Sequence, residues 1–458
     1  MAVVRALLLA ACVLVAGCGS ATAPKRAEPG PRAAERWPDG ARYALDLRYD
    51  EQAFALAGSE RISFVNTSPS ALQSVWLRAW ANAFGTCGAP RAETRITAGA
   101  TLGAQRAGCT ALELKLANPL APGARAEVAL DIRVTVPARA DRFGRIGDVA
   151  SFGNGIPILA VGDRGGWHLP PYTDRGESFY SLASIWNLNV QAKRGLAIAS
   201  TGTQTASRPE GDTRTVTLSA PRARDFALVI GPMTVRTLVA AGVRLRRFVK
   251  PRTPEREIRA ALRTARAALL AYEHRFGPYG AKELDIVEGP AEVANGGVAM
   301  EYPELVLTPA WPPALVHEIA HQWWFGIVGN DEWSEPWLDE SMAEYSAASL
   351  PDRIGGPDRL GLCHSLPKRL PPLNSTMARF DNPPPRVYAR AIYVAGACAL
   401  KRLERGIGRA RMDRFLRGLV TTHRYGVLTT ADFVEALRRA APKGFNVDDW
   451  LRSANLRV

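Results

Sequence analysis

The sequence of 458 residues lacks the features that mark repeat proteins, membrane-spanning proteins and nucleic-acid-binding proteins. It has no internal repeat, so we expect two or three ordinary domains rather than a repeat array. Its amino-terminal apolar run, from Ala6 to Ala16, is too short to span a bilayer as a mature helix. Basic residues outnumber acidic ones, 58 to 44, which gives a net charge of +14. Arginine is spread along the chain without a base-reading motif, so we expect no nucleic-acid partner.

Cysteine is also scarce, with six residues in all, and one of them follows the apolar run. The tetrapeptide Val15-Ala16-Gly17-Cys18 resembles a bacterial lipobox, which implies cleavage before Cys18 and lipid attachment to its sulfur. The alternative is an ordinary secretory signal, although such signals end in an A-x-A-like site. We therefore predict a signal peptide at 1–17, a flexible tether at 18–40, and an exported protein held at the membrane through Cys18.

Once Cys12 leaves with the signal peptide and Cys18 carries lipid, four cysteines remain. An even number in an exported chain indicates two disulfides, with three possible pairings. Proximity along the chain favours Cys87 with Cys109 and Cys363 with Cys398. A second metal site at Cys363-His364 has no C-x-x-C partner and is disfavoured.

Histidine is as scarce as cysteine, and two of the six histidines lie in the pentapeptide HEIAH at 317–321. Pro312 and Pro313 suit a helix start, and Gly326 and Gly329 suit its end. Histidines at i and i+4 project from one helical face, where both can bind one Zn²⁺ at roughly 2.0–2.1 Å. An ordinary surface turn with the same letters is the alternative.

Two glutamates complete the predicted zinc centre. Glu318, beside the first histidine, is placed to act as general base on the water that zinc binds. Glu340 follows His321 after 18 intervening residues, about one turn into a second helix that starts near Pro336 and ends before Pro351. Three protein ligands leave one position open, as in a catalytic zinc site. One turn further along, Glu344 is expected to face solvent.

These residues resemble a known family. The segment HEIAHQWW…WLDE is similar to the gluzincin metallopeptidases of the aminopeptidase N and leukotriene hydrolase family, here in a short bacterial lipoprotein form. Residues 296–303, GGVAMEYP, resemble that family's Gly-x-Met-Glu-Asn exopeptidase loop, and residues 393–396, YVAG, resemble its Tyr-x-Lys-Gly segment. The departures are two residues inserted before Met300, Tyr302 in place of Asn, and Ala395 in place of Lys.

The resemblance implies roles for the remaining site residues. Glu301 would bind the α-amino group of a peptide substrate, next to a cleft lined by Gly297, Ala299 and Met300. Tyr393 would donate its hydroxyl to the oxyanion that forms at the scissile carbonyl, with Tyr388 as a rival five residues earlier.

The pattern of apolar residues divides the chain in two. Residues 41–246 alternate apolar and polar side chains, as in Tyr43, Leu45 and Leu47, which predicts an antiparallel β domain. Residues 247–458 show mainly helical periodicity. The fold class is therefore α+β. The resemblance implies a saddle-like β domain followed by a thermolysin-like zinc peptidase domain, without the family's large carboxy-terminal helical domain.

The sequence predicts a zinc-dependent metallopeptidase with one Zn²⁺ per chain, most simply an aminopeptidase that removes amino-terminal residues from peptides outside the cytoplasm. The alternative is an enzyme of the same family with a different cleavage specificity: an endopeptidase, a dipeptidase or a leukotriene-hydrolase-like enzyme. A non-catalytic surface scaffold that has kept the fold is the alternative from another class, and the intact zinc-binding residues disfavour it.

Overall fold

The computed structural model describes residues 36–288, 299–309, 311–354, 356, 363–367 and 369–457. The predicted signal peptide at 1–17, Cys18, most of the tether at 18–40, and Gly297 lie outside the described residues. Within the described ranges, no helix is long and apolar enough to cross a membrane.

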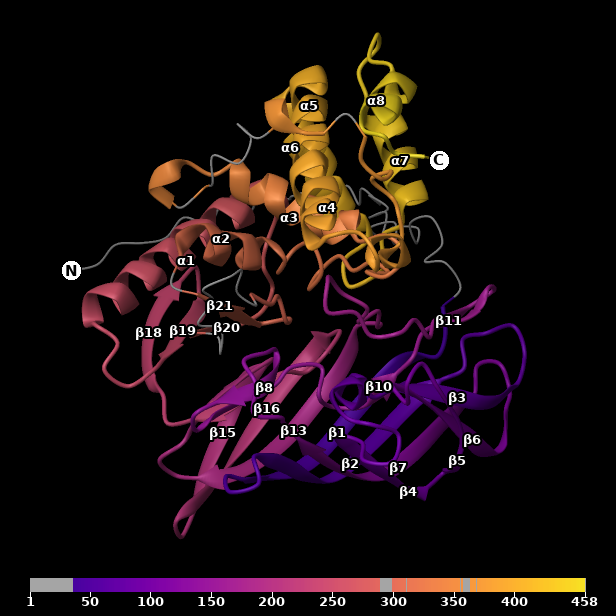
Figure 1. Ribbon diagram of the computed structural model, residues 1–458, viewed down its shortest axis with the longest axis vertical. Coiled ribbons are helices and arrows are strands. Elements are labelled where there is room, and N and C mark those ends of the chain that lie inside the picture. Colours follow the sequence, from indigo (N-terminus) through magenta and orange to yellow (C-terminus); the bar gives the residue numbers. More distant parts are fainter. Residues whose placement is uncertain are drawn as a thin grey trace, which may run out of the picture. The chain divides into compact units, whose positions relative to one another are not determined.

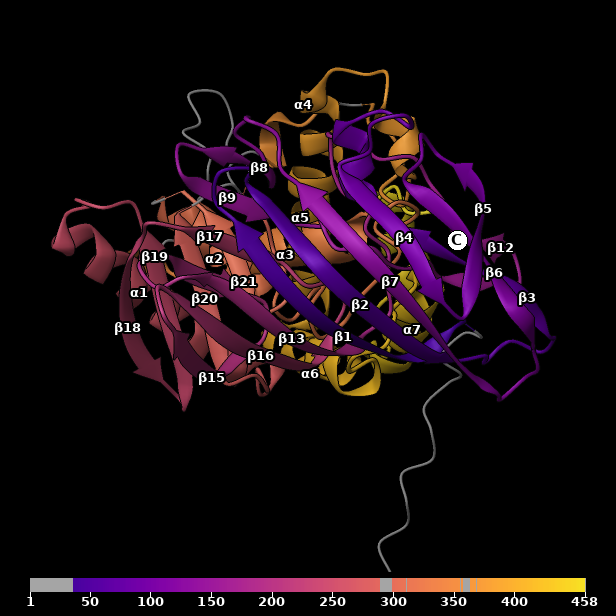
Figure 2. The ribbon, with the colours of Figure 1, turned by 90° about the horizontal axis from the view of Figure 1, so that it is seen from below.

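The amino-terminal part is built on a seven-stranded sheet in the order β15-β16-β13-β1-β2-β7-β4, whose strands run side by side in Figures 1 and 2. Its strands are β1 (Asp39–Asp50), β2 (Ala55–Val65), β4 (Ala92–Ala98), β7 (Arg125–Thr135), β13 (Ser184–Lys193), β15 (Thr203–Glu210) and β16 (Thr213–Ala223). Every second residue of β1 is buried, as the alternation predicts. The predicted antiparallel sheet has one exception, because β1 and β13 pair in parallel.

Three smaller sheets complete this β part. One has the order β10-β3-β6-β5, one the order β14-β17-β9-β8, and one is the hairpin of β11 and β12. Their strands are β3 (Leu72–Arg78), β5 (Ala100–Arg106), β6 (Ala111–Leu120), β8 (Phe143–Ile146), β9 (Val149–Phe152), β10 (Ile158–Leu159), β11 (Gly162–Asp163), β12 (Gly166–Trp167), β14 (Ala197–Ser200) and β17 (Leu228–Gly231). In the core, the rings of Tyr43 and Trp186 stack with their centroids 3.9 Å apart. Cys87 and Cys109 form a disulfide, as predicted.

The fifth sheet shows that the predicted boundary at 246/247 is misplaced. It contains β18 (Thr234–Ala240), β19 (Val243–Val249), β20 (Glu283–Glu288) and β21 (Leu305–Thr308), in that order. The boundary falls inside β19, which pairs in parallel with β20. Ion pairs hold that register, because Arg246 contacts the buried carboxylates of Glu283 and Asp285. The division between the two parts therefore lies before β18.

The carboxy-terminal part, from β18 onward, is otherwise helical. Its α-helices are α1 (Glu255–Phe276), α2 (Pro312–Ala320), α3 (Trp337–Ala348), α4 (Pro385–Tyr388), α5 (Ala395–Ile407), α6 (Arg409–Thr422), α7 (Thr430–Ala440) and α8 (Val447–Ser453). A π-helical segment, Ala389–Val394, joins α4 to α5. The predicted helix at the HEIAH motif begins at the expected prolines but ends at Ala320, before the expected glycines. Beyond it the backbone bonds span five residues, as from the Gly326 amide to the His321 carbonyl. Cys363 and Cys398 form the second predicted disulfide.

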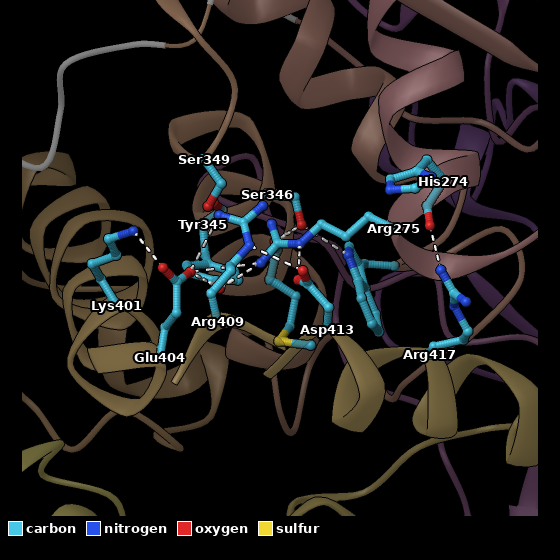
Figure 3. A network of polar contacts seen from close by, with 12 residues as sticks. His274, Arg275, Tyr345, Ser346, Ser349, Lys401, Glu404, Arg409, Asp413 and Arg417 are labelled. Carbon is cyan, nitrogen blue, oxygen red and sulfur yellow. Dashed lines mark hydrogen bonds and ion pairs between the residues drawn. The ribbon is translucent and has the colours of Figure 1, made fainter. Parts of the chain in front are cut away.

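A buried arginine ties four of these helices together (Figure 3). Arg275, at the end of α1, donates to the Asp413 carboxylate on α6 at 2.7 Å and to the Tyr345 hydroxyl on α3 at 2.5 Å. Tyr345 in turn donates to Glu404 on α5. Because a buried charge is stable only when it is paired, these bonds fix α3 against its neighbours.

The β part and the carboxy-terminal part belong to one compact unit. Buried hydrogen bonds join them. The Phe179 amide donates to Glu332 at 2.9 Å, and Arg224 donates to the Phe325 carbonyl at 2.8 Å. His168 lies between two carboxylates, Asp163 at 2.7 Å and Asp331 at 2.9 Å. The last contact crosses between the parts, since Asp331 precedes α3.

Candidate metal centre

Three metal-donor atoms converge between α2 and α3. The Nε2 atoms of His317 and His321 lie 3.0 Å apart, and the Glu340 Oε2 atom lies 3.2 Å and 3.3 Å from them. His317 comes from α2, His321 caps its end, and Glu340 lies in the first turn of α3. All three side chains are buried. The structure therefore brings together the three residues that the sequence predicted as ligands.

Hydrogen bonds at the other ring nitrogens fix which atoms face this point. His321 Nδ1 lies 3.0 Å from the Trp324 carbonyl oxygen, which only accepts, so Nδ1 carries the proton. His317 Nδ1 likewise faces the Glu344 carboxylate at 3.0 Å. In the neutral rings, both Nε2 atoms then present lone pairs to each other and to Glu340. Three acceptors at this spacing repel one another unless a cation lies among them, so the donor set fits a metal ion.

Glu344 is the residue that the sequence reasoning placed wrongly. It was expected to face solvent, but it is buried one turn beyond Glu340 and accepts from His317. The reason is geometric: residues four apart share a helical face, so the face of α3 that presents Glu340 also presents Glu344 to α2. A carboxylate behind a ligating histidine orients the ring and makes it a stronger donor.

Two further carboxylates point at the same space. Within the described chain, Glu318 Oε2 and Glu301 Oε1 are buried without a hydrogen-bond partner. Glu301, Glu318 and His321 each place one donor atom within 4.8 Å of the others. Buried polar atoms are normally paired, so unpaired oxygens here indicate that the space receives a metal ion, water or a substrate group.

The exopeptidase-loop residues divide between the two faces of their strand. Ala299 and Glu301 line the cavity, whereas Met300 is 2% exposed and packs in the core of the β part. The backbone of Met300 pairs with Leu307 on β21. In an extended chain, successive side chains point to opposite faces, so Met300 points away from the face of Ala299 and Glu301. The Met300 side chain thus points away from the cavity, and the predicted substrate-binding role of Met300 stays a prediction for its backbone.

Tyr393 lies in the π-helical segment, directly against the donors. Its hydroxyl donates to Glu340 Oε1, and its ring lies nearly parallel to that of His317, with centroids 5.7 Å apart. A π-helical turn inside a helix is rare and occurs frequently at functional sites. The rival Tyr388 contacts the Tyr393 ring edge-on, and its buried hydroxyl bonds to no other described residue.

These groups line one cavity of about 290 Å³. It is lined by Glu177, Ala299, Glu301, Pro309, Trp311, Pro313, Ala314, His317, Glu318, His321, Glu340, Glu344 and Tyr393. Glu177 is the residue that the sequence reasoning missed. It comes from the loop before β13, pairs with the buried Arg142, and lies within 4.8 Å of Glu301 and Glu340, measured between carboxylate oxygens. No periodicity or motif marks it.

Burial and neighbouring charges shift the ionisation of these groups. Burial raises the pKa of Glu318 to about 8, with the two histidines opposing the rise. Burial likewise raises the pKa of Glu177 to about 7, against the Arg142 guanidinium. Burial also opposes ionisation of Glu340, but its close contacts with the two histidines outweigh burial and lower its pKa. Negative charge on Glu318 and Glu177 is therefore costly in this cavity unless a cation enters it.

Comparison with known proteins agrees with this geometry. Residues 313–453, which hold all three donors, Glu318 and Tyr393, match the model of the Peptidase family M1 domain. These residues therefore form a peptidase family M1 domain. Such a domain implies a zinc ion, and His317, His321 and Glu340 offer a compatible set of donors. Because one carboxylate and two histidines is a common ligand set for catalytic zinc, the residues of this M1 domain fit the metal.

Among characterised relatives, this chain is 25% identical to mouse aminopeptidase B over 213 residues, which cover 40% of the chain and 32% of the relative. It is 22% identical to aminopeptidase N of Streptomyces lividans over 31% of the chain and 18% of that protein. The matches thus span a third or less of these relatives.

Solved structures share the fold over nearly the whole chain. The M1 zinc metallopeptidase of Deinococcus radiodurans superimposes with a TM-score of 0.68 at 17% identity, covering 93% of this chain and 94% of that one. A mutant of that protein bound to a Tyr-Ser-Ala substrate gives a TM-score of 0.66 at 19% identity. The β part followed by a helical catalytic part is therefore the two-domain M1 fold.

Proposed function

We propose that this protein is a zinc-dependent aminopeptidase that removes amino-terminal residues from peptides. The observation that carries the proposal is the cluster of Glu177 and Glu301 beside the three metal donors. Two carboxylates at one end of a small cavity suit a substrate ammonium group, because charge-assisted hydrogen bonds are about twice as strong as neutral ones. A peptide anchored there presents its first peptide bond to the metal centre.

A zinc ion at this site would supply a water molecule of lowered pKa and polarise the scissile carbonyl. The work of the chain itself begins with Glu318, whose unpaired Oε2 faces the cavity. This oxygen accepts the proton of the attacking water and then delivers it to the leaving amine. Burial favours the protonated form of Glu318 by raising its pKa, which suits the second half of that transfer.

The other residues bind and orient. Glu301 and Glu177 hold the α-amino group, and the ion pair with Arg142 keeps the Glu177 carboxylate turned toward the cavity. Tyr393 donates its hydroxyl to the carbonyl oxygen as negative charge develops there, the moment at which such a donor helps most. Its hydroxyl already reaches the carboxylate of Glu340, so it stands at the edge of the metal position.

We also propose that the protein is exported and anchored through lipid on Cys18. The lipobox-like sequence before Cys18 supports this, and so do the two disulfides, because disulfides persist in oxidising compartments. Cell fractionation after Cys18→Ala tests it. The protein should move from the membrane to the soluble fraction, and unchanged membrane association would contradict the anchor.

The substrate's amino terminus gives the sharpest test of the function. A free tripeptide should be hydrolysed at its first bond, and the same peptide with an acetylated amino group should be cleaved at least 100-fold more slowly. Glu318→Gln, assayed in parallel, excludes a contaminating peptidase. Equal cleavage of both peptides, or cleavage at an internal bond, would favour the endopeptidase alternative instead.

A further inference from the structure

Half of the protein's net charge lies in one short stretch. Residues 401–443 contain eleven Lys or Arg against four Asp or Glu, a net charge of +7 out of the +14 of the whole chain. The remaining chain carries 47 basic and 40 acidic residues. The stretch covers most of α5 and all of α6 and α7. The expectation that the basic residues are spread along the chain is therefore wrong for this stretch, where they are concentrated.

The few acidic residues of this stretch are already engaged. Glu404 accepts from Lys401 at 2.7 Å, and Asp413 accepts from Arg275 and Arg409, as Figure 3 shows. Asp432 accepts from the Thr429 hydroxyl in the capping box of α7. Glu435, the fourth, pairs with Arg439 on the same helix.

A groove of about 350 Å³ lies between α6 and α7, and we call it the α6–α7 groove. Its lining is Arg411, Arg414, Phe415, Gly418, Leu419, Thr422, His423, Ala436, Arg439 and Ala440. The α6 members recur every three or four residues over about 18 Å of helix. Phe415 and Leu419 are buried and form an apolar floor, while Gly418 is small enough to let another chain approach closely.

The rim of the groove is basic and largely uncompensated. Its lining contains no carboxylate, and within the described chain neither Arg411 nor Arg414 forms an ion pair. Arg439 pairs with Glu435, but both side chains are more than half exposed, and such pairs contribute at most about 1 kcal/mol. A partner's carboxylates would find three guanidinium groups around an apolar strip.

We infer that the α6–α7 groove binds an acidic, amphipathic segment of another polypeptide. Apolar side chains of that segment would pack on Phe415 and Leu419, and its carboxylates would meet Arg411, Arg414 and Arg439. This is the helix-in-groove mode, in which anchors repeat at three- and four-residue spacing. Residues 1–35 of this chain are not suited to occupy the basic groove, because they carry four basic and only two acidic residues. A bilayer surface is flat and would meet the rim without reaching the floor.

The probe for this site is a fluorescein-labelled helical peptide of Leu, Ala and Glu, acetylated at its amino terminus so that it is not a substrate. Fluorescence polarisation with the full chain should give saturable binding, and the same peptide with Lys for Glu should not bind. Arg414→Glu should weaken binding at least tenfold. Arg405→Glu, an equal charge change at an exposed position of α5 outside the groove, should change it less than threefold.

Gly418→Leu tests the groove without changing charge. Apart from its own helix backbone and its two chain neighbours, nothing lies within 4 Å of a Cβ added at Gly418, so the new side chain should fill the groove without disturbing the fold. It should abolish peptide binding and leave peptide hydrolysis unchanged, which keeps this inference independent of the proposed aminopeptidase activity. Wild-type affinity in Gly418→Leu, or equal losses in Arg405→Glu and Arg414→Glu, would overturn it. Binding to phosphatidylglycerol vesicles but not to the peptide would overturn it as well.

Discussion

The helical part and the β part contribute to the same cavity in different ways. The helical part supplies the metal donors, Glu318 and Tyr393 from α2, α3 and the π-helical segment, all within 80 residues of one another. The β part supplies Glu177 from a loop far upstream. The metal centre thus depends on helix geometry, whereas recognition of the amino group depends on how two parts of the chain meet.

Replacing the base should give the largest loss on the helical side. Glu318→Gln keeps the shape of the side chain and removes its ability to take a proton, so kcat should fall about 10²–10⁴-fold. Zinc content, measured by mass spectrometry, should stay at one per chain. Retained hydrolysis with zinc bound would show that the helical part does not use Glu318.

Removing the tyrosine hydroxyl should come next. Tyr393→Phe should lower kcat about 10²–10³-fold with little change in KM, because the hydroxyl acts where charge develops. The matched control is Tyr388→Phe, whose hydroxyl has no hydrogen-bond partner among the described residues. Steady-state kinetics of both variants decides the matter: equal losses would contradict the distinct role of Tyr393.

Replacing Glu344, which lies behind the ligand His317, should have a smaller effect, on zinc affinity. Glu344→Ala leaves the three donors in place but frees the His317 ring, so zinc affinity should fall about 10–100-fold. Competition with a fluorescent chelator measures this. Glu344→Gln can still accept the Nδ1 hydrogen bond and should fall between wild type and Glu344→Ala. If both variants bind zinc as tightly as wild type, Glu344 plays no part in orienting the ligand.

The smallest effect, on the free energy of unfolding, is expected at His168, which joins the two parts. Hydrogen bonds to Asp331 and Asp163, with burial opposing them, raise the pKa of His168 above its usual 6.5. A folded-state pKa above the unfolded value means that this stabilisation is complete below pH 6.5 and is lost as pH rises through the folded pKa. Urea unfolding at pH 6 and pH 9 should show that His168→Gln loses about 1 kcal/mol more at pH 6 than at pH 9. Equal losses at both values would contradict the account.

Sequence reasoning worked well where local geometry decides the outcome. The spacing of His317, His321 and Glu340 reflects the period of two adjacent helices, so the donor set was predictable, as was the alternation in β1. Glu344 follows from the same period but has no motif of its own. The inward direction of the Met300 side chain was not predictable, because the direction of a side chain in an extended segment depends on which strand it pairs with.

Glu177 was beyond sequence reasoning because tertiary packing places it. Its neighbour Gly176 lies so close to the segment after α3 that a Cβ there would come within 2.7 Å of both the Met377 side chain and the Tyr388 hydroxyl. Glycine therefore permits the loop of the β part to press against the catalytic part and deliver Glu177. Nothing in the local sequence encodes that approach, since the contacting residues lie about 200 positions away.

The central claim, that the β part completes a binding site for a free amino group, is tested most directly by one ratio. It is kcat/KM for a free tripeptide divided by that for its acetylated form, compared between wild type and Glu177→Gln. Gln can still accept from Arg142, so the loop should keep its place. Loss of one charge-assisted bond should lower the ratio about 10–100-fold, mainly through KM. An unchanged ratio would contradict the claim.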